Sequence, residues 1–156
     1  MTITILPYAP AHAPIFDRLN RAWIEEHFSI EPFDDLVLTQ PEEYILKGGG
    51  EIWFAALDGK VVGTCALLNF APGVFEFTKL GVDEVARGKG VARTLLLHCR
   101  DRAKAKGAHT LKIFTSSKLI PANALYRSEG FLQVEMTPEQ KQRYLRGNVM
   151  YDLALV

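Results

Sequence analysis

The stretch EVARGKGVARTLL, from Glu84 to Leu96, combines residue types suited to binding an anion. Gly88 and Gly90 flank a lysine, and an apolar helical pattern follows them. Glycine lets a ligand approach the backbone closely, and the first amides of a helix have no intrahelical acceptor. The helix dipole adds partial positive charge at the same place. Three cationic side chains add full charge: Arg87, Lys89 and Arg93. The stretch therefore predicts a site for a phosphate-like anion, or else a basic turn without a ligand.

Two common phosphate-binding motifs do not match this stretch. A P-loop requires glycine, four further residues and then Gly-Lys-Ser/Thr. Here Gly88-Lys89 is followed by Gly90, and Asp83 stands where the first glycine belongs. The dinucleotide fingerprint needs a third glycine where Arg93 stands. The sequence thus argues against both sites and leaves an anion cradle of another kind.

The spacing of apolar residues predicts the elements that position this stretch. Asp58-Gly59 between two apolar runs indicates a β-hairpin. After Gly90 the apolar period becomes that of a helix, which Gly107 ends. The strand–helix–strand order there favours a parallel strand pair with a right-handed crossover. The expected strands are Thr2–Leu6, Ile52–Leu57, Lys60–Phe70, Val74–Val82, Leu111–Thr115, Phe131–Glu135 and Val149–Leu155.

Further helices complete the predicted fold. One begins near Pro14 and reaches His27, and another lies between Pro121 and Gly130. The segment 29–46, which is broken by two prolines, predicts a loop with one or two helical turns, and a short helix or turn is expected at Thr137. We therefore expect a mixed α/β (α+β) single domain over residues 1–156, antiparallel at one end with a crossover in the middle.

The composition is that of an ordinary globular domain. The chain has 156 residues, of which 48% are hydrophobic and 23% charged, and 18 basic residues balance 18 acidic ones. This balance provides no overall field for nucleic acid or an anionic membrane. Cys65 and Cys99 lie in apolar segments without Cys-x-x-Cys spacing, which favours buried free thiols over a disulfide or a zinc site. Neither a secretory signal nor the ~20 apolar residues of a membrane span can be found, so we expect a cytoplasmic protein.

The glycine stretch becomes specific when it is joined to its neighbours. The order strand, RGKGVA, amphipathic helix, strand and ANALYRSEGF resembles the GNAT superfamily of acyl-CoA-dependent N-acetyltransferases. Arg87, Gly90 and Ala92 match that family's Arg/Gln-x-x-Gly-x-Gly/Ala motif. The later segment matches its Leu-Tyr-x-x-x-Gly-Phe signature through Leu125, Tyr126, Gly130 and Phe131. The resemblance implies the GNAT fold along essentially the whole chain, a mixed sheet of about seven strands flanked by helices.

The resemblance also implies where acetyl-CoA, the expected cosubstrate, binds. In that family the loop amides hold the CoA pyrophosphate, and the preceding strand separates from its parallel neighbour so that the pantetheine arm lies in the gap. An amide of this strand would stabilise the oxyanion. Many members have an asparagine where Leu119 stands here, and Asn123 is the candidate substitute. The implied cofactor-binding residues are Leu80, Gly81, Val82, Arg87, Gly88, Lys89, Gly90, Val91, Ala92 and Asn123, and no metal is expected.

Two residues are candidates for proton transfer. Tyr126 matches the tyrosine that in this family often protonates the departing CoA thiolate; the alternative is a packed tyrosine whose hydroxyl is satisfied. A phenol of pKa about 10 can donate to a thiolate of pKa about 8.5–10. Glu76 is the candidate base for the acceptor amine, or else a glutamate at a solvated sheet edge. Strand alternation predicts that Glu76 faces the same side as Thr78, Leu80 and Val82.

The acceptor side is the least defined part of the expected site. In the family the first helix, the loop after it and the final strands build the acceptor pocket. The implied candidates are Trp23, His27, Phe28 and Glu31. Aromatic residues at helical spacing are more often core, which is the alternative for the tryptophan and the phenylalanine.

These observations predict an enzyme that transfers the acetyl group of acetyl-CoA to a primary amine of a small molecule. Direct attack in a ternary complex is expected, because no cysteine with a matching base is found. The alternatives are acetylation of a peptide or protein amine, an acyl-CoA sensor without turnover, and a domain for another phosphate. We expect no nucleic-acid or membrane partner, and a homodimer remains open.

Overall fold

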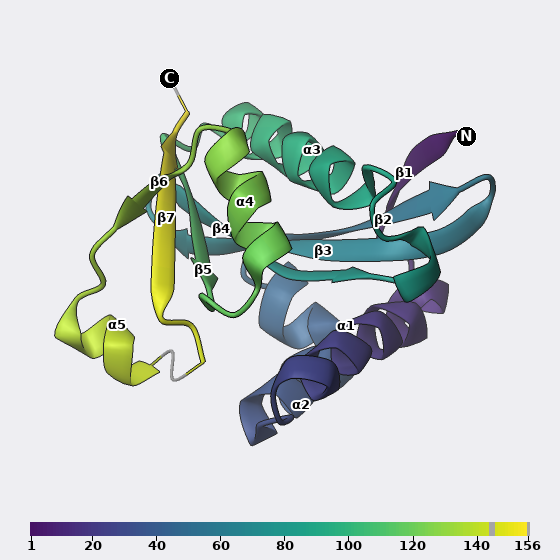
Figure 1. The fold of residues 1–156 in the computed structure, drawn as a ribbon, viewed down its shortest axis with the longest axis horizontal. Helices are drawn as coiled ribbons and strands as arrows, with labels where there is room; N and C mark the ends of the chain where they lie inside the picture. The colour runs from purple at the N-terminus through teal and green to yellow at the C-terminus, as the bar shows by residue number, and fades with distance from the viewer. Residues whose placement is uncertain (144–145, 156) are drawn as a thin grey trace.

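The computed structural model describes residues 1–143 and 146–155. Its described strands form one seven-stranded mixed sheet in the order β1-β2-β3-β4-β5-β7-β6 (Figure 1). Their bounds are β1 Ile3–Pro7, β2 Glu51–Leu57, β3 Lys60–Ala71, β4 Val74–Val82, β5 Thr110–Thr115, β6 Leu132–Val134 and β7 Val149–Ala154. All neighbouring pairs are antiparallel except β4 and β5, which are parallel. The predicted fold class is confirmed, and each predicted strand is found within two residues at either end.

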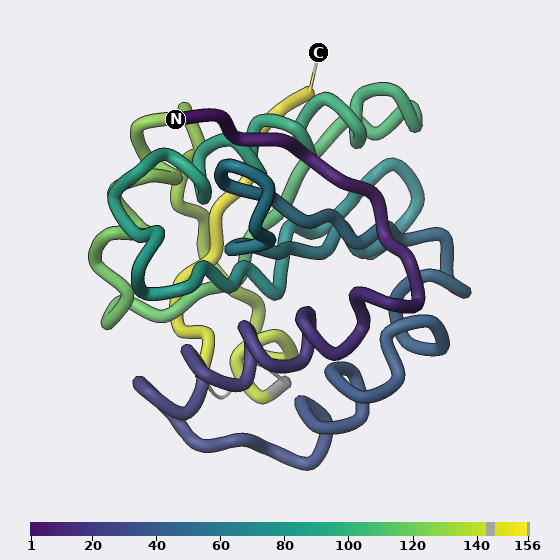
Figure 2. Tube along the Cα trace, turned by 90° about the vertical axis from the view of Figure 1, so that its right-hand side faces the viewer, coloured from purple at the N-terminus to yellow at the C-terminus, as the bar shows by residue number. Residues whose placement is uncertain are grey.

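Helices cover both faces of this sheet. In Figures 1 and 2, α1 and α2 lie against one face, and α3 and α4 lie on the other. The helices are α1 Ala13–His27, α2 Pro32–Thr39, α3 Val91–Ala105, α4 Ile120–Ser128 and α5 Pro138–Arg143. Short 3-10 segments span Pro10–His12 (η1) and Glu84–Ala86 (η3), and Glu42–Leu46 (η2) is a π-helical turn. No helix within the described ranges is long and apolar enough to cross a membrane.

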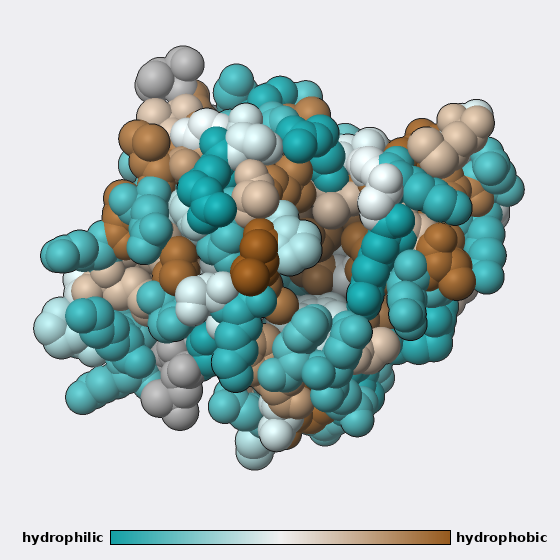
Figure 3. All heavy atoms as spheres, in the orientation of Figure 1, coloured by the Kyte–Doolittle hydropathy of each residue, from teal (hydrophilic) through white to brown (hydrophobic). Residues whose placement is uncertain are grey.

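Each face of the sheet buries its own hydrophobic core, because alternate strand residues point to opposite faces. The core under α3 and α4 contains Phe77, Leu95 and Leu111, all nearly or fully buried. The core under α1 and α2 is built around Phe16 and Phe54. Figure 3 shows mostly hydrophilic side chains over the exterior, with hydrophobic ones in a hollow between α4 and α1.

The parallel pair of β4 and β5 is short. Only three registered pairs join them, the last between Glu76 and Lys112, although β4 continues to Val82 and β5 to Thr115. Beyond Glu76 the two strands diverge, and the edge of β4 that faces β5 carries no strand partner among the described residues. The expected separation of this strand from its parallel neighbour is therefore found.

A bulge in β4 corrects one prediction. The β3–β4 register shifts between the Thr64 and Ala66 partners, so β4 holds one extra residue there, and Lys79 adopts a positive φ of 54°. This extra residue inverts the alternation of side chains along the strand. As a result Leu80 and Val82 pack into the α3/α4 core together with Phe77. The prediction that Glu76 shares their face was wrong, because simple alternation cannot foresee a bulge.

The same inversion brings Gly81 under α1. A Cβ at Gly81 would lie 3.0 Å from the carbonyl oxygen of Leu19 and 3.3 Å from the amide nitrogen of Asn20. Such contacts with backbone atoms leave no room for a side chain. Gly81 therefore lets the first helix approach β4 directly beside the point where the sheet opens.

Candidate functional site

The loop before α3 presents a row of backbone donors. Gly88 and Gly90 both have positive φ, 77° and 84°, and a Cβ at either would meet no atom within 4 Å. The first helical hydrogen bond runs from the Thr94 amide to the Gly90 carbonyl, at 3.0 Å. The amides from Gly88 to Arg93 have no acceptor within the part of the chain that the structure describes. The loop can therefore offer them to an anion at the positive end of the helix.

The three cationic side chains of the loop differ in their surroundings. Arg87 forms an ion pair with Glu26 of α1, at 3.1 Å between Nη2 and Oε2, and this pairing lowers the pKa of Glu26. Arg93 points to the end of α4, where it pairs with Glu129 and donates to Ser128. Lys89 is exposed and has no ion-pair partner within the described ranges. Since exposed ion pairs contribute little, Arg87 remains able to exchange Glu26 for a ligand.

Tyr126 lies beneath α4 with only 5% of its surface exposed. Its ring packs against Phe77, Phe131 and Tyr151, with centroids 5.9 to 6.4 Å away. Burial, with a smaller electrostatic contribution from Cys65 and Tyr151, raises the pKa of Tyr126 far above that of a free phenol. Its hydroxyl makes no hydrogen bond with any described residue, so the alternative of a satisfied hydroxyl is not supported. The phenol therefore stays protonated, and its hydroxyl has no acceptor among the described residues.

Asn123 has a structural role instead of an open side chain. Its amide donates to the carbonyl oxygens of Ser116 and Leu119, at 2.9 and 2.7 Å. Its oxygen accepts from the Tyr151 hydroxyl, at 2.8 Å. These three bonds tie α4 to β7 and to the loop after β5 and leave the Asn123 side chain engaged. A contact between Asn123 and the cofactor stays a prediction, and it would have to be made beside these internal bonds.

Glu76 is buried, not placed at a solvated edge, with 6% of its surface exposed. It is in register with Lys112 of β5, whose Nζ lies 2.7 Å from the carboxylate of Asp152 on β7. Glu76 also acts electrostatically on Lys79 at the bulge. The carboxylate therefore belongs to a row of alternating charges across β4, β5 and β7, next to the point where β4 and β5 separate.

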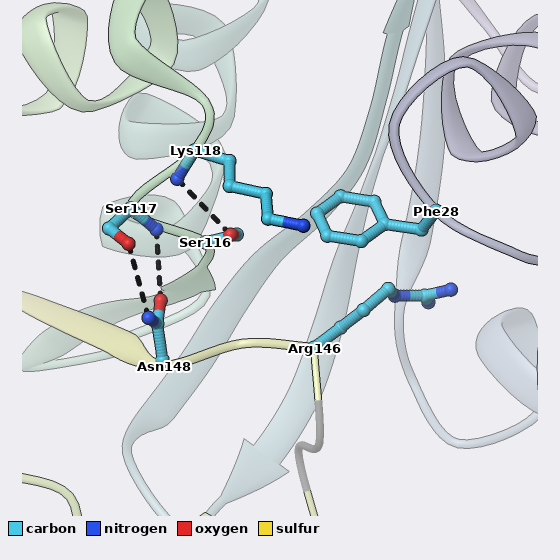
Figure 4. Close-up of a pocket in the computed structure, with 6 residues that line it drawn as sticks. All are labelled: Phe28, Ser116, Ser117, Lys118, Arg146 and Asn148. Atoms are coloured by element: carbon cyan, nitrogen blue, oxygen red, sulfur yellow. Dashed lines mark hydrogen bonds between the residues drawn. The ribbon is translucent and has the colours of Figure 1, made fainter.

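A cavity of about 280 Å³ opens where β5 leaves the sheet (Figure 4). Its lining residues are Phe28, Ser116, Ser117, Lys118, Arg146 and Asn148. Lys118 and Arg146 approach the Phe28 ring from two sides, at 5.4 and 5.6 Å from its centroid. Asn148 bridges to Ser117, accepting from its amide at 2.9 Å. The cavity thus combines an aromatic wall with hydroxyl and cationic groups, which suits a small polar molecule.

Of the four acceptor candidates, only Phe28 lines this cavity. Trp23 packs edge-on against Phe28, and its indole donates to Asn20 at 3.0 Å. His27 is exposed beside Glu26, and Glu31 is exposed at the start of α2. Phe28, which directly follows α1, therefore reaches the cavity, and the other three candidate residues lie around it.

Sequence reasoning missed the buried carboxylate that anchors the cavity. Asp34 of α2 is 4% exposed and accepts two hydrogen bonds from Arg146, at 2.6 and 2.7 Å. The Nζ atom of Lys79 lies 3.5 Å from Oδ1 of Asp34, and the backbone amide of Glu31 donates a hydrogen bond to the same carboxylate. Burial alone would raise the pKa of Asp34, but these partners outweigh it and lower the pKa. Because 112 positions separate Asp34 from Arg146, no local pattern could have revealed the pair.

The two cysteines are buried, as predicted. Cys65 and Cys99 are 0% exposed, with their sulfur atoms 3.5 Å apart. Burial raises the pKa of Cys65, which disfavours the thiolate needed of a nucleophile. Within the described residues, no group of three or more His, Cys, Asp or Glu side chains could hold a metal ion.

Comparison with known proteins agrees with this geometry. The family model described as "Acetyltransferase (GNAT) family" matches residues 14–131. The chain is 30% identical over 116 residues to the uncharacterized N-acetyltransferase YvbK of Bacillus subtilis, covering 71% of this chain and 74% of that protein. It is 36% identical over 99 residues to N-acetylaspartate synthetase of Xenopus tropicalis, covering 62% of this chain. The match spans only 36% of that longer protein.

Solved structures agree on the fold. A GNAT acetyltransferase from Staphylococcus aureus aligns with a TM-score of 0.87 at 21% identity, covering 99% of this chain and all of that one. The PaiA N-acetyltransferase of Thermoplasma acidophilum, solved with coenzyme A, aligns with a TM-score of 0.76 at 16% identity and 99% coverage of both chains. The chain therefore belongs to the GNAT family of acetyltransferases, and a structural neighbour was solved with coenzyme A.

Asp34 offers a direct test of the cavity's anchor. We expect Asp34→Asn to lower the free energy of unfolding by about 3–5 kcal/mol at pH 7, because Arg146 and Lys79 lose their buried counter-charge. The pKa of Asp34 is lowered by folding, so its contribution is complete above the unfolded value near 3.8 and is lost as pH falls below that value. Urea unfolding at pH 7 and pH 3 measures both effects.

The neighbouring Asp35 is the matched control. Its side chain is 56% exposed and pairs with Arg21 at the surface. Asp35→Asn should therefore change stability by less than about 1 kcal/mol. An Asp34→Asn loss no larger than this control, or one that does not shrink at pH 3, would contradict the anchoring role.

Proposed function

We propose that the protein transfers the acetyl group of acetyl-CoA to a primary amine of a small molecule by direct attack in a ternary complex. The observation that carries this proposal is the run of unpartnered amides from Gly88 to Arg93, which opens beside the separated strands β4 and β5. Amides at a helix start suit a pyrophosphate, and an unpaired strand edge suits an extended amide-containing arm.

The residues fit CoA in the following way. The amides of Gly88, Lys89, Gly90, Val91 and Ala92 would hold the pyrophosphate, with charge from Lys89 and Arg87. The backbone of Leu80, Gly81 and Val82 would face the pantetheine arm, because within the described ranges this part of β4 has no strand partner on the β5 side. Bound there, CoA supplies the thioester, and the chain supplies donors for its phosphates and its carbonyl oxygen.

The transfer itself needs two proton movements. The amine nitrogen, once it has lost a proton, bonds to the thioester carbon, and the carbon–sulfur bond breaks. Glu76 would accept the amine proton, directly or through water, and Tyr126 would donate a proton to the departing thiolate. The hydroxyl of Tyr126, which has no hydrogen-bond acceptor among the described residues, supports the second role. The burial of both cysteines supports direct attack over an acyl-cysteine intermediate.

A small acceptor is favoured by the volume of the cavity. About 280 Å³ lies near the lower limit of small-molecule sites, and the Phe28 ring forms one wall of the cavity. The name of the relative N-acetylaspartate synthetase, which describes acetylation of a small amine, supports the same class of acceptor. A protein amine would need a longer open groove. We take residues 1–156 as one acetyltransferase domain.

Thiol release tests the proposal as a whole. The purified protein, mixed with acetyl-CoA and a panel of small primary amines, should release CoA thiol with at least one amine. Calorimetry should show binding of acetyl-CoA and not of ATP, because the loop lacks a triphosphate motif. Binding without release for every amine would favour an acyl-CoA sensor, and equal binding of ATP would overturn the CoA site.

Tyr126→Phe tests the proton donor. The ring contacts remain and no described hydrogen bond is lost, so stability should be unchanged. Turnover should fall about 100-fold while the affinity for acetyl-CoA stays the same, because only protonation of the thiolate is removed. Steady-state kinetics and thermal unfolding provide the two measurements.

The matched control is Tyr151→Phe, which removes a hydroxyl bonded to Asn123 and Arg127. This variant should lose about 1–3 kcal/mol of stability. Unchanged turnover in Tyr126→Phe would exclude its acid role.

Glu76→Gln tests the base. The amide has a similar shape but cannot accept the amine proton, so kcat/KM for the acceptor should fall about 100-fold. The loss should be greatest well below the pKa of the amine, where little free amine is present. A pH profile of kcat/KM with and without the substitution measures this. A loss of equal size at every pH would argue for a structural role of Glu76 beside Lys112.

A further inference from the structure

We propose that the acceptor amine carries a carboxylate and that Lys118 binds this carboxylate in the cavity beside Phe28. The inference rests on the proposed function and names the chemical class of its acceptor. Two cationic side chains line the cavity, and they differ in whether an anion already pairs with them.

Among the described residues, the cavity is lined by two cations and by no carboxylate. Arg146 is largely neutralised, because both of its terminal nitrogens bond to Asp34. Asp34 and Glu31 act on Arg146 without lining the cavity. Lys118 has no ion pair and no side-chain hydrogen bond among the described residues, and its ammonium lies 5.4 Å from the Phe28 ring centroid. One positive charge at the cavity is therefore left without an anion.

The groups around Lys118 suit a carboxylate. Ser116 and Ser117 place hydroxyls at the same wall, and Figure 4 shows the Lys118 amine pointing into the space between them and Phe28. The lysine ammonium is a point charge whose N–H donors can rotate, so it can bind a carboxylate through only one of the two oxygens. Arg146 is already paired with Asp34, so Lys118 is the cation that is left for a ligand. A cationic acceptor such as a polyamine would meet repulsion from Lys118.

The cavity also adjoins the reaction centre. Ser116 directly follows the end of β5, at the edge that separates from β4. Its carbonyl oxygen accepts a hydrogen bond from Asn123, which lies one turn before Tyr126 on α4. The wall that holds Lys118 and the helix that holds the proposed proton donor are thus joined. A molecule anchored by its carboxylate on Lys118 lies on the acceptor side of the gap between β4 and β5.

Equilibrium titration separates this inference from the question of turnover. The protein saturated with CoA is titrated by calorimetry with two matched pairs, glutamate against glutamine and alanine against alaninamide. At least one pair should show binding of the carboxylate member that is about tenfold tighter. A difference between glutamate and glutamine would show that a side-chain carboxylate is bound. A difference between alanine and alaninamide would show that the α-carboxylate is bound.

Substitution of Lys118 then tests the residue. Lys118→Met should abolish this discrimination, Lys118→Arg should retain most of it, and Lys104→Met on the exposed face of α3 should change nothing. In thiol-release assays Lys118→Met should raise KM for the acidic acceptor about tenfold, with KM for acetyl-CoA unchanged. Equal binding within both pairs, or discrimination that survives in Lys118→Met, would overturn the inference.

The outcomes for the two proposals are distinct. Turnover of neutral amines without charge selection would leave the proposed function standing and refute the carboxylate site. Charge-selective binding that depends on Lys118, with no thiol release for any amine, would refute the proposed function and support the binding site.

Discussion

The early end of the parallel pairing between β4 and β5 is the constraint on which the rest of the site depends. Three registered pairs hold the strands together, and the bulge at Lys79 then redirects β4. A bulged strand bends and twists more strongly, so it cannot follow a straight neighbour. The edge that this leaves unpaired would be a liability in an ordinary sheet, since exposed strand edges recruit other strands. Here α4, whose Tyr126 packs on Phe77 of β4, and the loop after β5 border the opening.

The two sides of the gap are stabilised by different kinds of interaction. On the α3/α4 side, aromatic packing and the hydrogen bonds of Tyr151 and Asn123 hold α4 in place. On the α1/α2 side, Asp34 joins a helix, the bulge and the segment before β7 through Lys79 and Arg146. A buried carboxylate with two cationic partners fixes the relative positions of the three side chains. It makes the structure more rigid only while all three are present. The acceptor cavity therefore depends on one charge cluster, whereas the cofactor side depends on packing and backbone.

The fold and the glycine loop before α3 were predictable from the sequence, and the cavity beside Phe28 was not. Gly88, Gly90 and the helical period after them are local signals, and the Leu-Tyr-x-x-x-Gly-Phe segment added a second one. The bulge at Lys79 could not be predicted, because the sequence around it still nearly alternates between apolar and polar residues. Only the face of the sheet to which each later residue points is changed. Lys118, Arg146 and Asp34 escaped because their meeting depends on the tertiary approach of α2 to the segment before β7. His27 and Glu31 were selected by their position after the first helix, and that position alone does not decide which side chains reach the cavity.

The alternation of side chains along β4 before the bulge gives the proposed chemistry a direction. Phe77 packs with Tyr126 on the α3/α4 face, whereas Glu76, the preceding residue, projects to the other face. The proposed acid and base thus lie on opposite sides of the sheet and can act on one reaction only where the sheet is open. A thioester lying in the gap between β4 and β5 would have its sulfur towards Tyr126 and its carbonyl carbon accessible from the side of Glu76. Had β4 and β5 stayed paired to their ends, the same two side chains would be separated by a continuous layer of backbone. In the proposed function, the separation of the strands would therefore both receive the cofactor arm and let the two proposed proton-transfer groups act on one reaction.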